Sequence, residues 1–166
     1  MKNCQAFTFK APGLVPAIHM PVTIISGAKS IQIQAVWDTG AMTSCISTRV
    51  ASHLGLVPIG QNTHHSASGT FECIDYIVDI SLLNQVKIPD VRVSDFAGGP
   101  GIDALIGMDI ITMGDLSITN AGQKTVMSFR IPPDAFHIDY VQMQKSANKN
   151  AAALKQFKKK MKKRAK

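Results

Sequence analysis

The stretch that decides the expected fold is Ile31-Gln32-Ile33-Gln34-Ala35-Val36-Trp37-Asp38-Thr39-Gly40-Ala41. Its first seven residues alternate between apolar and polar and include β-branched side chains, a pattern typical of a strand with one buried face. Asp38-Thr39-Gly40 follows at once, and Asp and Gly favour a turn. These residues alone are a weak signal. Their position is informative, because it places a carboxylate at the tip of a strand.

Most of the remaining apolar segments predict further short strands. Residues 17–25 are expected to form a hairpin with the strand that ends at Asp38. Pro21 within that segment indicates an edge or a bulge. Other strands are expected at 5–10, 44–46, 76–82, 86–93, 116–119 and 124–130, the last two as a hairpin. So many short strands at this spacing predict an all-β fold with a closed barrel.

Two short helices are expected beside the strands. Ser47 can cap a helix that runs to Leu54, and Gly55 can end it. A second helix is expected over 108–113, with Asp109 in its first turn, where a negative charge is favoured. One or two helices of this length leave the fold class unchanged.

The length and composition predict one domain followed by a tail. The chain has 166 residues, of which 45% are hydrophobic, enough for one globular core. We expect a domain over residues 1–140 and a Lys-rich tail over 141–166. No apolar stretch is long enough to cross a bilayer and no secretory leader is recognisable, so no membrane insertion is expected. Cys4, Cys45 and Cys73 share no metal-ligand spacing and predict free or buried thiols in a reducing compartment, with the cytoplasm as the default.

The positive charge of the chain is concentrated at its C-terminal end. Residues 145–166 hold ten Lys/Arg and no Asp/Glu, whereas the other residues hold 8 basic and 11 acidic side chains. Such a block of like charges is usually disordered by itself. It could bind a polyanion, either nucleic acid or an acidic protein surface, or it could only keep the protein soluble. The sequence leaves both possibilities open.

Three elements, taken in chain order, resemble the retropepsin-like aspartic proteases. Asp38-Thr39-Gly40-Ala41 ends a strand, Leu105-Ile106-Gly107-Met108-Asp109 leads into the second helix, and a closing hairpin contains Phe129-Arg130. The resemblance extends from Ala17 to Ile131 and is closest to the bacterial members. Viral members often carry Arg where this chain has Met108-Asp109.

The resemblance implies that one chain supplies half of an active site. Peptide hydrolysis by an aspartic enzyme needs two carboxylates around one water. This sequence has a single Asp-Thr-Gly, and Asp103, the nearest candidate for a second acid, lacks the Thr/Ser-Gly that would follow. We therefore expect Asp38 of each protomer to be catalytic in a two-fold homodimer. Thr39 is expected to join the two loops across the dyad, Gly40 to let the substrate approach, and Ala41 to complete the loop.

The resemblance also implies residues that surround this loop. Leu105, Ile106 and Gly107 are expected to pack beneath it and hold it in place. A mobile hairpin, the flap, is expected to close over the substrate and exclude water. The candidates for its tip are Ser66, Ala67, Ser68 and Gly69.

The histidines do not predict a metal site. His64 and His65 are adjacent, so they face opposite sides of a strand. Together with His19 and His53 they lack a Cys or a carboxylate at a ligand spacing. Neither a metal nor a cofactor is expected.

The sequence thus favours a homodimeric aspartic endopeptidase that acts on a peptide or protein. One alternative is a non-catalytic module of the same fold that dimerises or binds peptides. Another is a nucleic-acid-associated protein that uses the basic tail. The intact Asp-Thr-Gly favours the enzyme, because a scaffold has no physical need for an uncompensated pair of carboxylates.

Overall fold

A computed structural model describes residues 4–66 and 69–164. The chain divides into two compact units, Met1–Pro133 and Asp134–Lys166, and each is described by itself. The first unit contains the strands and the second contains one long helix.

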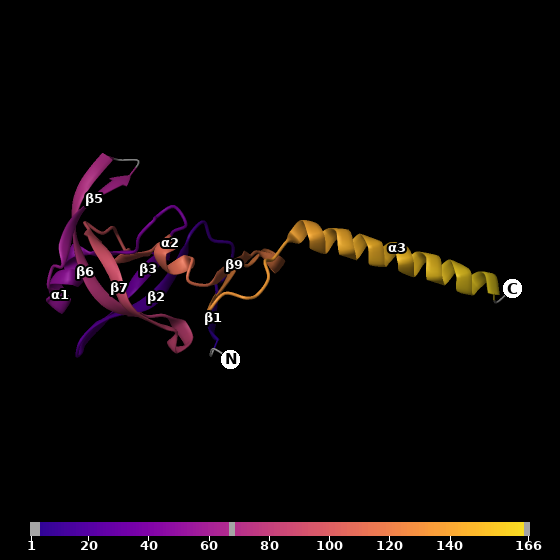
Figure 1. The fold of residues 1–166 in the computed structure, drawn as a ribbon, viewed down its shortest axis with the longest axis horizontal. Coiled ribbons are helices and arrows are strands. Elements are labelled where there is room, and N and C mark those ends of the chain that lie inside the picture. Colours follow the sequence, from indigo (N-terminus) through magenta and orange to yellow (C-terminus); the bar gives the residue numbers. More distant parts are fainter. Residues whose placement is uncertain (1–3, 67–68, 165–166) are drawn as a thin grey trace. The chain divides into compact units, whose positions relative to one another are not determined.

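Six strands of the first unit form a closed barrel (Figure 1). In spatial order they are β2 (Ile18–Ser26), β3 (Lys29–Trp37), β8 (Ala104–Ile106), β4 (Cys45–Ser47), β7 (Lys87–Phe96) and β6 (Gly69–Ser81). The barrel closes where Thr23–Ile25 of β2 pair with Asp79–Ser81 of β6. Pro21 precedes this pairing and has β3 as its paired neighbour, which agrees with an edge position. The predicted all-β barrel is confirmed.

Strands that are distant in the sequence lie beside each other where the Asp-Thr-Gly turn begins. β3 pairs with β8 in parallel, with Val36 opposite Leu105 and Trp37 opposite Ile106. β8 in turn pairs with β4, the strand that follows the turn. The end of β3 therefore lies between β2, where Ile18 is opposite Trp37, and β8, which separates it from β4.

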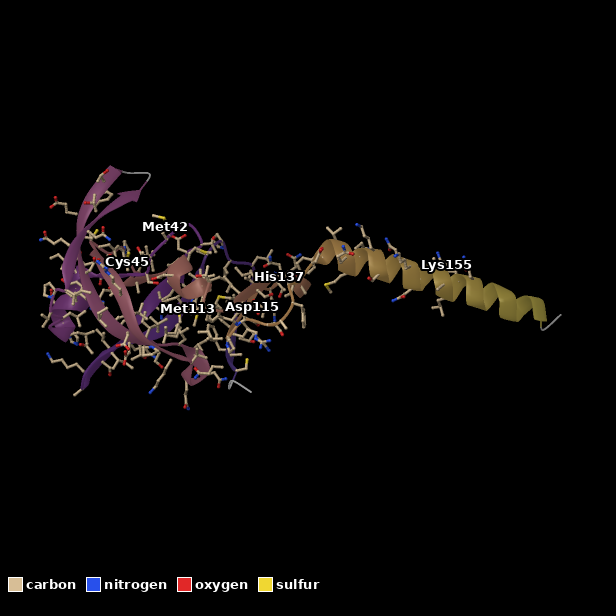
Figure 2. The ribbon with its side chains drawn as sticks, in the orientation of Figure 1. Met42, Cys45, Met113, Asp115, His137 and Lys155 are labelled. Carbon is tan, nitrogen blue, oxygen red and sulfur yellow. The ribbon has the colours of Figure 1, made fainter. Side chains whose placement is uncertain are left out.

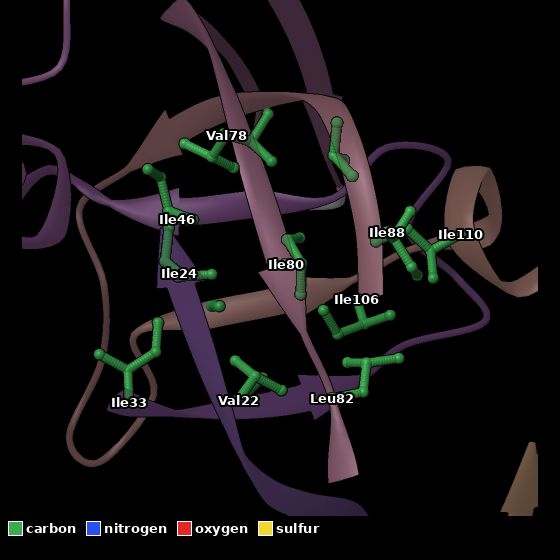
Figure 3. Close-up of a cluster of buried hydrophobic side chains, with 14 of the residues drawn as sticks. Val22, Ile24, Ile33, Ile46, Val78, Ile80, Leu82, Ile88, Ile106 and Ile110 are labelled. Carbon is green, nitrogen blue, oxygen red and sulfur yellow. The ribbon is translucent and has the colours of Figure 1, made fainter. Parts of the chain in front are cut away.

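The strands of the barrel bury alternate residues. In β2, Ile18, Met20, Val22 and Ile24 are buried while their neighbours are more exposed. Equivalent residues from the other strands meet them in one core. Figure 3 shows this cluster, which includes Val22, Ile24, Ile33, Ile46, Val78, Ile80, Ile88, Ile106 and Ile110. Burial of this apolar area is the main favourable term for folding.

A second, three-stranded sheet has the order β1 (Gln5–Lys10), β10 (Val126–Ile131) and β9 (Asp115–Thr119). Three aromatic rings join it to the barrel. Phe129 of β10 lies with its ring centroid 5.0 Å from that of Trp37 of β3, and Phe7 of β1 lies 6.0 Å from both. Packing of aromatic rings at such angles stabilises the fold beyond the free energy gained from burying their apolar area.

The first helix, α1 (Thr48–Leu54), matches its expected bounds. The Ser47 side chain accepts a hydrogen bond from Val50 N–H, and Gly55 ends the helix in the left-handed conformation. The second, α2 (Met108–Ile111), is shorter than the expected 108–113. Gly114 lies against the backbone of β10, where a Cβ would meet Arg130 O, so the chain must leave the helix before that point. Two 3₁₀ turns, η1 (Leu83–Gln85) and η2 (Ala121–Gln123), complete the unit.

The second unit consists mainly of α3 (Tyr140–Arg164). Asp139 caps it, because its carboxylate accepts hydrogen bonds from Val141 and Gln142 N–H. The charge of residues 145–166 favours disorder of the isolated segment, whereas the structure describes residues 140–164 as helical. Ala, Lys, Gln and Leu have high helix propensities, which here outweigh the repulsion between like charges. No helix in the described part of the chain is long and apolar enough to cross a membrane.

We predict that Phe129→Ala destabilises the first unit by about 3–5 kcal/mol, the usual cost of removing a buried phenyl ring. The ring is 1% exposed and contacts both other aromatic rings. Chemical denaturation would measure the loss. Ile118→Ala on the neighbouring strand is the control, since Ile118 is 47% exposed and its loss should cost about 0.5 kcal/mol. Equal losses in the two variants would contradict the role given to the aromatic cluster.

Candidate active site

Asp38 is the residue that directly follows β3, and the backbone fixes its position. Its N–H donates to Ile106 O at 2.9 Å, which continues the pairing of β3 with β8 by one residue. Its carboxylate accepts a hydrogen bond from Gly40 N–H at 2.8 Å, and its carbonyl accepts one from Ala41 N–H at 3.2 Å. These bonds make a tight turn in which Asp38 is half-buried and Thr39 and Gly40 are exposed. The carboxylate is therefore held at the surface of the unit by its own loop.

The segment that follows the turn rests on Gly107 and the start of α2. Met108 N–H donates to Ala41 O at 2.8 Å, and Asp109 N–H donates to Met42 O at 3.1 Å. A Cβ on Gly107 would lie 2.7 Å from Thr43 C, so only glycine permits this approach. Gly107 and the start of α2 therefore pack against the backbone of residues 41–43.

Hydrogen bonds between Ser44 and Asp109 also hold this segment in place. Ser44 donates to the Asp109 carboxylate through both its N–H, at 2.9 Å, and its hydroxyl, at 2.8 Å. The Ser44 hydroxyl also accepts from Gly107 N–H at 3.0 Å. The sequence places Asp109 in the Leu-Ile-Gly-Met-Asp element at the start of a helix and Ser44 in a short strand, and neither pattern indicates a contact between the two. The two residues are 65 positions apart, so the available signal was limited to an acid next to the Leu-Ile-Gly motif.

The carboxylate of Asp103 forms hydrogen bonds with residues at the start of α1. Its carboxylate accepts from Arg49 at 2.7 Å and from the Ser47 hydroxyl at 3.1 Å. The hydrogen bond from Arg49 holds the pKa of Asp103 below its usual value, against the opposing effect of burial. Ionised Asp103 therefore stabilises the folded state at pH values above the pKa that this carboxyl has in the unfolded chain. The stabilisation is lost as the pH falls through the lower pKa that it has in the folded chain. These contacts give Asp103 a structural role at the start of α1.

The cysteines near the site are buried thiols. Cys45 and Cys73 are each 8% exposed. Burial raises the pKa of Cys45 to about 11 and also raises the pKa of Cys73. Both remain protonated at neutral pH, and a protonated thiol is a poor nucleophile. Cys45 is thus a core residue, as expected.

A hairpin of β5 (Gly60–Ser66) and β6 lies where the flap is expected, and it extends beyond the barrel (Figure 1). Their register runs from Gly60 opposite Asp75 to Ser66 opposite Gly69. Ala67 and Ser68, two of the expected tip residues, lie outside the described residues. Among the described residues, no group of three or more His, Cys, Asp or Glu could hold a metal ion.

One side of the site is open in the single chain. Figure 2 labels Met42, next to the turn, and Met42 is 80% exposed. Exposed Thr39 and Gly40 lie in the same loop. A half-buried carboxylate with an apolar, accessible loop beside it can act on a bound molecule as an acid or a base, and it can contact a second protein chain.

Comparison with known proteins shows similarity to aspartic proteases. The sequence profile of a family described as aspartyl protease matches residues 20–110, more than half of the chain. No curated protein matches the sequence significantly. The matched range includes Asp38, Gly107 and Asp109.

Among solved structures, a retropepsin-like aspartic protease from Rickettsia conorii has a TM-score of 0.54 and 10% identity, over 79% of this chain and 98% of that one. The EIAV protease complexed with the inhibitor HBY-793 has a TM-score of 0.47 and 21% identity, over 59% of this chain and 88% of that one. The retroviral protease-like domain of Ddi1 from Leishmania major has a TM-score of 0.42 and 18% identity, over 68% and 94%. The Rickettsia structure shows that the fold is retropepsin-like.

We predict that Ser44→Ala destabilises the first unit by about 1–3 kcal/mol, because Gly107 N–H would lose its acceptor in a buried position. Thermal or chemical denaturation would measure the change. Thr48→Ala is the matched control, since Thr48 is exposed and its hydroxyl bonds to Phe96 O away from the loop. A Ser44 variant as stable as the Thr48 variant would refute this role.

Proposed function

We propose that this chain, which belongs to the aspartyl protease family, is an aspartic endopeptidase that acts as a homodimer. The observation that carries the proposal is the position of Asp38, fixed at the end of β3 by Ile106 and Gly40 on an exposed loop. The sequence has a single Asp-Thr-Gly, so Asp38 of a second protomer supplies the other carboxylate. A two-fold axis brings the two loops together by symmetry.

In the proposed mechanism the two carboxylates share one proton, because two like charges so close cannot both ionise. The ionised Asp38 takes a proton from the water that attacks the scissile carbonyl carbon. The protonated Asp38 donates a hydrogen bond to the carbonyl oxygen and stabilises the negative charge that develops there. A proton then passes to the leaving nitrogen as the C–N bond breaks.

The other residues of the loop have supporting roles in this proposal. Thr39 is exposed, so its hydroxyl can bond to the second protomer across the axis. Gly40 and Ala41 complete the turn, and Leu105, Ile106 and Gly107 hold it from beneath. The flap hairpin, with its tip at Ser66–Gly69, closes over the substrate.

We also propose that the enzyme works in the cytoplasm. Cys4, Cys45 and Cys73 are free thiols, and free thiols persist in a reducing compartment.

We predict that Asp38→Asn abolishes cleavage of a peptide library, with a loss of at least about 10²-fold in rate, because Asn cannot accept the proton of the water. Asn has nearly the same volume as Asp, so circular dichroism and dimer mass should not change. Asp134→Asn, which replaces an acid of the second unit in the same way, is the control. Undiminished cleavage by the Asp38 variant would exclude the assignment. A wild-type protein that binds peptides and cleaves none would favour the non-catalytic module.

We predict that specific activity falls on dilution below the dissociation constant of the dimer, because one chain holds one carboxylate of the pair. Activity and mass would be measured over the same range of protein concentration, by peptide cleavage and by analytical ultracentrifugation. A monomeric mass at a concentration where specific activity is still full would rule out the shared site.

The Lys-rich segment has a separate role in our proposal. We assign residues 1–140 to the protease domain and 141–166 to a tail that binds a polyanion. Residues 145–166 carry ten Lys/Arg and no acid, and α3 holds those up to Arg164 at helical spacing. Such a helix attracts nucleic acid or an acidic protein surface.

We predict that removal of residues 145–166 leaves peptide cleavage intact and abolishes binding to RNA or heparin. The binding of the full chain should weaken steeply with salt, because each neutralised phosphate releases counterions. Filter binding at several salt concentrations would measure it. Unchanged binding in the truncated protein would show that the tail only aids solubility, and lost cleavage would place the tail in the domain or the dimer contact.

A further inference from the structure

A cavity of about 330 Å³ lies between α2 and β7 in the first unit. Its lining includes Thr43 from the segment after Asp38, Asn62 from the flap strand β5, residues 88–92 of β7, and Ile110 and Met113 from α2 and the turn after it. Asp38 does not line it. The cavity is therefore bordered by both parts of the candidate site, the loop and the flap hairpin, without containing the carboxylate itself. Its volume is at the lower end of the range for ligand pockets, enough for a large side chain.

One part of the cavity wall is apolar. Ile88, Val91 and Ile110 are buried there, and Figure 3 shows Ile88 of β7 next to Ile110 of α2. Met113, labelled in Figure 2 beside α2, is 45% exposed and contributes a flexible apolar side chain. A wall of this kind favours a chain of methylene groups.

The lining of the cavity holds more acidic than basic side chains. Asp75, Asp90 and Asp109 line it, and Arg92 is the one basic residue among the described lining residues. Arg92 is already bound to Asp75 by two hydrogen bonds, at 2.6 and 3.2 Å. Two carboxylates thus remain without a cation from the lining, and a concave surface with an excess of one sign of charge attracts the opposite sign.

Asp90 is the lining carboxylate best placed to meet a ligand. Asp109 is engaged by Ser44 and by Ile110 N–H. Asp90 is exposed, and its N–H donates to the Asp79 carboxylate at 3.0 Å, which brings a further negative charge to this end of β7.

We propose that this cavity binds a lysine or arginine side chain of the peptide substrate, at a position remote from the scissile bond. The methylene groups lie against Met113, which is the exposed apolar side chain of the lining, and beside Val91, and the cationic end meets Asp90. This inference rests on the proposed function. Thr43 and Asn62 place the cavity next to the substrate only if the peptide binds between the loop and the flap.

The test uses pairs of decapeptides that differ only by lysine or norleucine at one position, which is moved along the peptide. Norleucine has the same methylene chain without the charge. The measured quantity is the ratio of kcat/KM for lysine to that for norleucine, in the full-length protein. At one position at least two residues from the cleaved bond, this ratio should exceed one, and it should fall about two- to fivefold in Asp90→Asn, the range for an exposed ion pair. Asn is the matched replacement, because Asp90 has a φ of 54° and Asn tolerates that conformation.

Met113→Glu adds a carboxylate at the exposed edge of the cavity, and it should raise the ratio at the same position. Asp134→Asn, which removes an acid from the other unit, should leave the ratio as in the wild type. A ratio of one at every position, or a preference that persists in Asp90→Asn, would overturn the proposal.

A binding arm separates this inference from the proposed function. Fluorescence anisotropy would measure the affinity of the same labelled peptides for Asp38→Asn, with and without Asp90→Asn. If the wild type cleaves no peptide, the protease proposal fails and binding alone decides. A lysine preference that Asp90→Asn removes would support the cavity, and equal affinity for lysine and norleucine peptides would reject it.

Discussion

The hydrogen bond from Asp38 N–H to Ile106 O is the contact on which the rest of the site depends. It extends the parallel pairing of β3 and β8 past the last residue of β3, so the carboxylate leaves the barrel at a defined point. Gly107, the residue that follows β8, lies so close to Thr43 that no side chain fits between them. Because the barrel is closed, neither strand can shift without breaking pairings on both sides.

The acids around this contact divide into two groups by their partners. Asp103 is paired with Arg49, Asp75 with Arg92, and Asp109 with Ser44, so each holds two elements together. Asp38 accepts a hydrogen bond from its own turn and lies on an exposed loop. A carboxylate satisfied by a cation is stabilised in its charged form and is a poor proton carrier, whereas one held by its own loop can exchange a proton with a ligand.

Local patterns predicted the parts of the structure that local forces determine. Ser47 and Gly55 delimit α1 as expected, because a cap and a left-handed residue act on their own helix. The expected helix over 108–113 was too long, because Gly114 packs on β10, far away in sequence. The Ser44–Asp109 pair was missed for a similar reason, since nothing near either residue indicates the other. In the tail the two local signals disagree, since the like charges favour disorder and the residue types favour the helix that the structure describes.

The sequence by itself determined the strand pattern, the acidic turn at Asp38, the Leu-Ile-Gly motif and the separation of charge between the domain and residues 145–166. Each follows from side chains that are close together along the chain. Only the tertiary structure decided which acid stays accessible, how Gly107 and Asp109 hold the loop, and that Asp90 and Met113 line a cavity beside β5. Those features depend on pairings between distant strands, and such pairings are selected by the closure of the whole barrel and not by any one segment.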